Sequence, residues 1–78
     1  MIKPTGQRCV LKVELSLDKD GNEVVAQEAK VIESGVSEIK KGDIVFFNQF
    51  GAVSINSLKT KKNIVLIVDS EDIYAVLK

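Results

Sequence analysis

The sequence predicts a small all-β domain, and three observations lead to that prediction. Apolar and polar residues alternate over Arg8–Leu17, which is the period of a half-buried strand. Ile44–Phe47 and residues 64–68 are short, wholly apolar runs, as in strands covered on both sides within a small closed barrel. Turn-forming residues separate these runs at close spacing, and short strands punctuated in this way are typical of a barrel or a sandwich.

The first expected strand, Arg8–Leu17, has one apolar face. Side chains at alternate positions point to opposite faces of a strand, so one set faces the core and the other faces solvent. The core-facing set is Cys9, Leu11, Val13, Leu15 and Leu17, and the solvent-facing set is Arg8, Lys12, Glu14 and Ser16. Residues 18–22 tolerate positive φ, so we expect the strand to turn there.

Residues 23–34 carry two competing signals. Residues 26–30 favour a helix by intrinsic propensity, and Val25, Ala29 and Ile32 could share one helical face. A strand at residues 29–33 would instead return beside the first strand, and Gly35 would open the next turn. We expect the strand, and a helix or a mobile loop stays an open alternative.

The second half of the chain is expected to form short strands joined by turns. A Lys-Gly-Asp turn within residues 39–43 precedes Ile44–Phe47, and acidic residues 69–72 separate residues 64–68 from a last strand, Ile73–Leu77. Between these strands we expect a bend at Phe50 and Gly51, a short strand at residues 52–55, and a loop at residues 58–63 whose lysines are solvated. Because no linker or repeat is evident, we expect residues 1–78 to form a single domain.

The composition narrows the possible partners. With 78 residues, the domain is small enough that its core is only marginally self-sufficient. The 11 basic and 11 acidic residues cancel to a net charge of zero, which disfavours non-specific binding to nucleic acid. No apolar run approaches the length of a membrane span. We therefore expect neither nucleic acid nor a membrane as a partner.

Residues that usually carry catalysis are scarce. Histidine is absent, so the chain lacks the usual general base, and the single cysteine, Cys9, has no histidine to activate it. We expect Cys9 to be a small buried hydrophobe, and the absence of a disulfide framework predicts a cytoplasmic location. Residues 18–23 look like a calcium loop, but the glycine comes too early. We expect no enzyme activity, no cofactor and no metal site.

The last expected strand, Ile73–Leu77, is strongly apolar for a strand at the C-terminal end of the chain. Such an edge strand presents unpaired backbone groups and apolar surface unless something covers it. Pairing with a neighbouring subunit would cover the edge and enlarge the small core. The alternative is that both ends of the chain pair within one barrel.

Three blocks of the sequence together resemble the GroES-like co-chaperonin family (chaperonin-10 type). They are Ile2-Lys3-Pro4 followed by residues 8–13, the Lys41–Asn48 turn and strand, and residues 63–77, and they cover about half of the chain in the family's order. The resemblance implies a small β-barrel that forms a ring, usually a heptamer, and caps a large GroEL-like chaperonin. In that family the last strand pairs with the first strand of the adjacent subunit. This implies a subunit interface at Ile2, Lys3, Pro4, Arg8, Val10, Ile73, Tyr74, Ala75, Val76 and Leu77.

The resemblance also implies where a chaperonin would bind. Family members carry a mobile loop after the first strand, with a glycine and an apolar tripeptide that docks on the chaperonin. The corresponding stretch, residues 16–28, is short here, and its docking residues would be Gly21, Val24, Val25 and Ala26. The alternative is an ordered hairpin in which Leu15 and Leu17 pack against the valines. Residues 32–39 leave space only for a tight connection, so we expect no roof hairpin and an open-topped ring.

Two functions from different classes follow. The first is a co-chaperonin that assists protein folding by capping a chaperonin chamber, and a loop flexible in the free protein would support it. The second is a ring-forming structural or viral assembly protein that has kept the barrel and lost the docking loop, and an ordered hairpin at residues 15–25 would favour it. A monomeric barrel used as an adaptor is a third, weaker possibility.

Overall fold

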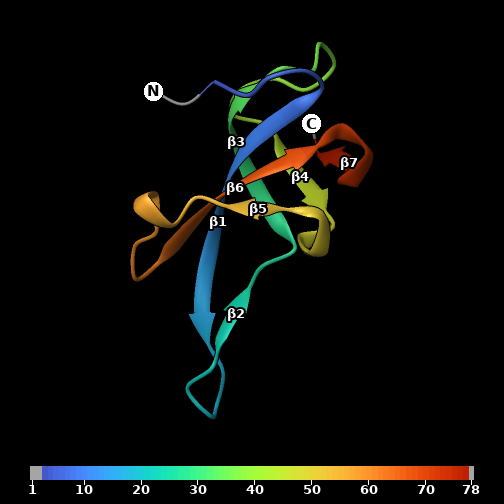
Figure 1. The fold of residues 1–78 in the computed structure, drawn as a ribbon. Helices are drawn as coiled ribbons and strands as arrows, with labels where there is room; N and C mark the ends of the chain where they lie inside the picture. Colours follow the sequence, from blue (N-terminus) through green and yellow to red (C-terminus); the bar gives the residue numbers. More distant parts are fainter. Residues whose placement is uncertain (1–2, 78) are drawn as a thin grey trace.

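The computed structural model describes residues 3–77 as one antiparallel β-sheet domain, which is drawn in Figure 1. The sheet has seven strands, and no α-helix occurs among the described residues. The strands are β1 (Arg8–Leu17), β2 (Glu23–Val25), β3 (Glu28–Ser34), β4 (Ile44–Phe47), β5 (Val53–Ser54), β6 (Asn63–Asp69) and β7 (Ile73–Leu77). Three single-turn 3₁₀ helices join the later strands: η1 (Gln49–Gly51), η2 (Asn56–Leu58) and η3 (Ser70–Asp72).

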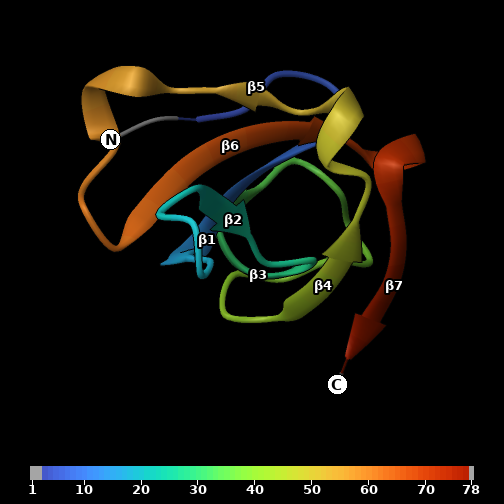
Figure 2. The same ribbon diagram turned by 90° about the horizontal axis from the view of Figure 1, so that it is seen from below.

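The strands follow the order β5-β6-β1-β3-β4-β7, and β2 pairs with the far end of β1. Figure 2 shows that the sheet curls round on itself. No ladder joins β5 to β7 within residues 3–77, so the sheet stays open, and the prediction of a closed barrel is not met. Strand β5 is only two residues long, and it pairs with β6 along one of its edges.

Strand β1 is the centre of the sheet. Its residues 8–14 pair with β6, and residues 9–12 also pair with β3 on the other side. A register shift between Val10 and Leu11 accompanies the pairing with β3, and Cys9, Val10 and Leu11 are all fully buried. The pairing skips Ile32, so the extra residue of this bulge belongs to β3, and β1 keeps its alternation against β6. Val10 is accordingly buried outside the cluster that contains Cys9 and Leu11.

The main core lies within the curl of the sheet. Cys9, Leu11 and Val13 from β1 meet Val45 and Phe47 from β4 and residues from β3 and β6. The connection between β3 and β4, residues 35–43, adds the buried side chains of Val36 and Ile39 and contains no strand. Residues 35–43 therefore close over the core without a roof hairpin.

The sequence predictions for the elements are largely confirmed. The bounds expected for β1, β4 and β7 are the observed ones, and residues 23–34 form two strands and no helix. The turn before β4 depends on Gly42, whose φ of +95° favours glycine, and on Asp43, whose carboxylate accepts from the Lys40 N–H at 2.9 Å. The prediction was wrong at Leu17, which is 70% exposed because β1 has left the body of the domain by that residue.

Two leucines of β1 allow a matched test of this core. Leu11 is fully buried and Leu17 is exposed. We expect Leu11→Ala to lower the free energy of unfolding by about 2–5 kcal/mol, because it leaves a cavity. Leu17→Ala should change it by less than about 0.5 kcal/mol. Urea denaturation followed by circular dichroism measures both, and equal effects would contradict this assignment of the core.

Candidate functional site

The chain offers two candidate interaction surfaces, and the first is the hairpin that we call the arm (residues 15–25). Here β1 and β2 pair in the register Leu15↔Val25, Ser16↔Val24 and Leu17↔Glu23. The arm projects away from the curled sheet, at the lower end of Figure 1. The stretch expected to be either a mobile loop or a hairpin is thus an ordered hairpin.

The tip of the arm is a tight turn built on Asp18. Its carboxylate Oδ1 accepts hydrogen bonds from the backbone N–H groups of Asn22 and Asp20, each at 2.9 Å. Gly21 has a φ of +83°, which glycine adopts without strain. These N–H donors, Asn22 foremost, stabilise the ionised carboxylate and hold the pKa of Asp18 below its ordinary value of 3.8.

The arm presents apolar side chains on both of its faces. Leu17 is 70% exposed and Val24 is 44% exposed, and the register places them on opposite faces of the hairpin. Val25 and Ala26 are half-buried and pack against the core. Of the predicted docking residues, Gly21 and Val24 are therefore accessible, while Val25 and Ala26 face inward.

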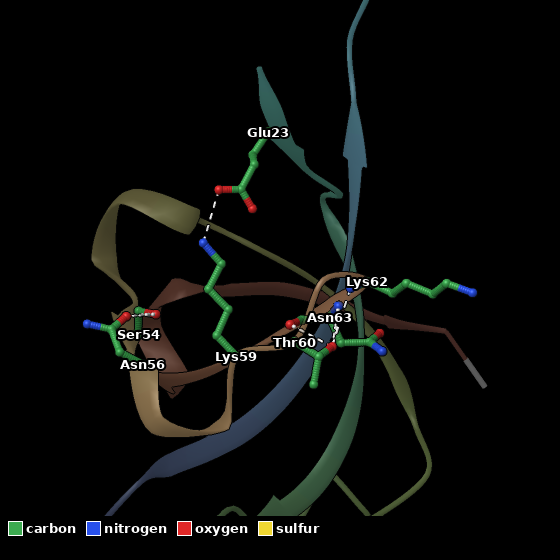
Figure 3. A network of polar contacts seen from close by, with 7 residues as sticks. All are labelled: Glu23, Ser54, Asn56, Lys59, Thr60, Lys62 and Asn63. Atoms are coloured by element: carbon green, nitrogen blue, oxygen red, sulfur yellow. Dashed lines mark hydrogen bonds and ion pairs between the residues drawn. The ribbon is translucent and has the colours of Figure 1, made fainter. Parts of the chain in front are cut away.

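A lysine-containing segment, residues 59–62, holds the base of the arm, as Figure 3 shows. The Lys59 ammonium forms an ion pair with the Glu23 carboxylate at 3.0 Å. The Leu15 N–H donates to the Lys62 carbonyl at 2.7 Å. Thr60 stiffens this segment, because its Oγ1 accepts from the backbone N–H groups of Lys62 and Asn63. We expected these lysines to be solvated, and Lys59, Lys61 and Lys62 are all exposed; no local sequence signal indicated that Lys59 also pairs with Glu23.

The second candidate surface is the outer edge of β7. One side of β7 pairs with β4, and within residues 3–77 its other side has no strand beside it. Tyr74 is 70% exposed and Leu77 57% exposed, whereas Ile73 and Val76 pack against the core. The exposed members of this predicted interface strand are thus Tyr74, Ala75 and Leu77.

An aromatic hollow of about 250 Å³ adjoins β7. Asn48 caps η1 by accepting from the Phe50 N–H at 3.1 Å, and this turn holds the Phe50 side chain 90% exposed. The hollow is lined by Gln27, Phe46, Phe47, Asn48, Gln49, Phe50 and Tyr74. Apolar surface therefore continues from the β7 edge on to η1.

The N-terminal part of the predicted interface is less uniform. Lys3 and Pro4 precede the first strand and belong to no element, and Ile2 lies outside the described residues. The Arg8 side chain lies 3.9 Å from the Asp69 carboxylate at the surface. Val10 has no exposed surface, and both of its backbone edges are paired within the chain. From Arg8 onward β1 is therefore an internal strand.

The described residues show little other candidate chemistry. Among residues 3–77, no three His, Cys, Asp or Glu side chains gather in a way that could hold a metal ion. Cys9 is fully buried, as predicted, and its Sγ lies 3.4 Å from the Ser34 hydroxyl. None of the described segments is a helix of the length and apolarity needed to span a membrane.

Comparison with known proteins finds no family model and no curated protein that matches this chain. The GroES-like resemblance therefore rests on the three sequence blocks quoted above. What it implies about assembly and partners is a matter for proposal and experiment.

The turn at the arm tip should respond to acid through Asp18. Because its folded-state pKa is lowered, its stabilising contribution is complete above the ordinary value of 3.8 and is lost as the pH falls through the folded-state pKa. The chemical shift of the Asn22 amide, followed by NMR, should report this loss. Asp18→Asn should abolish the titration, and Asp20→Asn in the same turn should leave it in place; an unchanged titration in Asp18→Asn would contradict the assignment.

Proposed function

We propose that this protein is a co-chaperonin, which forms a ring and binds a large GroEL-like chaperonin through the arm. The observation that carries the proposal is the arm itself, a projection that exposes Leu17 and Val24 away from the body of the domain. Exposed apolar side chains on a small projection cost solubility unless they have a partner. The position of the arm after the first strand is the one that the family resemblance assigns to the chaperonin contact.

Ring formation would use the β7 edge. An exposed, apolar edge strand favours pairing with another chain, and the side chains of Tyr74 and Leu77 would be buried in such a contact. Because β1 is paired on both sides from Cys9 to Lys12, the partner strand would come from the segment before it, around Lys3 and Pro4 of the adjacent subunit. We propose a heptamer by resemblance to the family.

The proposed activity is binding without catalysis. The ATP chemistry would belong to the chaperonin, and the short connection between β3 and β4 would leave the ring open at its top. A cytoplasmic location fits a protein whose single cysteine is an unpaired, buried thiol.

One observation favours a second function. The arm is an ordered hairpin and not a mobile loop, which is what we expect of a ring-forming structural or assembly protein that no longer docks on a chaperonin. Both functions require the ring, so only the partner of the arm distinguishes them.

The proposed subunit interface on β7 is tested by introducing charged side chains. We expect the double substitution Tyr74→Asp and Leu77→Asp to dissociate the ring into folded monomers, because both side chains are exposed in the isolated subunit and would be buried at the interface. Native mass spectrometry measures the assembly. Leu17→Asp, on the arm, is the matched control and should leave the ring intact. A double variant that still assembles would refute the interface.

The docking role of the arm is tested by replacing its exposed apolar side chains with polar ones. We expect Leu17→Ser with Val24→Ser to reduce chaperonin binding at least about tenfold, because two exposed apolar anchors are lost. Val53→Ser, at an exposed valine on β5 outside the arm, should leave binding unchanged. Surface plasmon resonance on an immobilised chaperonin ring measures both. Binding of wild-type strength in the double variant would exclude the docking role, and a ring that binds no chaperonin at all would favour the assembly protein.

A further inference from the structure

The arm in this structure hides part of its own apolar surface. The register of the hairpin directs Val25 and Leu15 to the same face, and Val25 and Ala26 pack against the core. A partner that binds three consecutive apolar side chains at residues 24–26 can contact only Val24 while β2 remains paired with β1. The paired arm is thus a closed state with respect to that contact.

The backbone hydrogen bonds between β1 and β2 stabilise the closed state only weakly. β2 contributes three paired residues, and a two-stranded hairpin of that size is marginal in water. The Ala26 N–H adds one bond to the Glu14 carbonyl, at 3.3 Å. Contacts from elsewhere in the chain can therefore decide how often the arm opens.

Lys59 supplies such a contact from a distant part of the sequence. Its ammonium reaches Glu23, the first residue of β2, across 36 positions in the sequence. It is one of two ion pairs formed among the described residues, and the other, Arg8–Asp69, is much longer at 3.9 Å. Figure 3 shows the Lys59 side chain extending from its loop toward Glu23 at the start of β2.

We propose that the Glu23–Lys59 ion pair is an electrostatic latch, which keeps the arm closed and must release before residues 24–26 can engage a partner. Lys59 is accordingly a positioning residue, because it acts on docking through its ion pair with Glu23. This inference rests on the proposed function for its second half, the effect on docking. Its first half, the control of arm opening, concerns this chain alone.

Amide hydrogen exchange tests the latch without any partner. We expect Lys59→Gln and Glu23→Gln each to speed exchange at the Val24 and Ala26 amides, which face β1, about two- to fivefold, the range expected for a half-exposed ion pair. Lys61→Gln removes the same charge from an exposed neighbour in the same segment and should change nothing. Added salt should speed exchange in the wild type and not in Lys59→Gln, because screening weakens the pair. Unchanged exchange in both latch variants would overturn the proposal.

Docking is tested with the same variants and a purified chaperonin ring, by surface plasmon resonance. We expect Lys59→Gln to bind about two- to fivefold more tightly than the wild type and than Lys61→Gln, because a larger fraction of arms is open. Faster exchange with weaker binding would show that the arm docks as a closed hairpin, which overturns the second half of the proposal. If no variant binds, the proposed function fails, and the exchange data still decide whether the latch exists.

Discussion

The double pairing of β1 is the constraint on which the rest of the structure depends. Between Cys9 and Lys12 this strand has β3 on one side and β6 on the other, and it delivers three fully buried side chains to the main core. The same strand then continues into the arm. Because β1 is paired with β6 as far as Glu14, the proposed opening of the arm would occur by movement of β2 and of the part of β1 beyond that residue.

The small size of the domain explains why some apolar side chains remain exposed to solvent. A chain of 78 residues buries a limited share of its surface, and here the sheet also stays open between β5 and β7. Apolar side chains that an additional strand would cover are left at its margins, with Val53 on β5 and Tyr74 and Leu77 on β7. Assembly through β7 would supply the missing cover. In that case, formation of the ring would also stabilise the subunit, because both depend on covering the same apolar surface.

Local sequence patterns predicted the secondary-structure elements, but features that depend on contacts between distant parts of the chain could not be predicted. Alternation located β1, and the glycine in the Lys-Gly-Asp turn marked the start of β4. Alternation could not show that β1 leaves the body before Leu17, since that depends on where β3 and β6 end. The burial of Val10 depends on β3 and β6, which pair with both edges of β1, and the Glu23–Lys59 pair joins residues far apart in the sequence; neither has a local signal.

The two candidate surfaces need opposite properties, one a fixed backbone and the other a movable one, and they lie on different strands of the chain. A ring interface needs a fixed edge, and β7 has one because Ile73 and Val76 anchor it in the core while Tyr74 and Leu77 face outward. A docking element that must bind and release benefits from a small ordering cost. If the arm docks as proposed, its short ladder and single exposed ion pair would keep the free-energy cost of opening small. A shortened hairpin can therefore replace a long loop if its closed state is held no more strongly than one exposed ion pair allows.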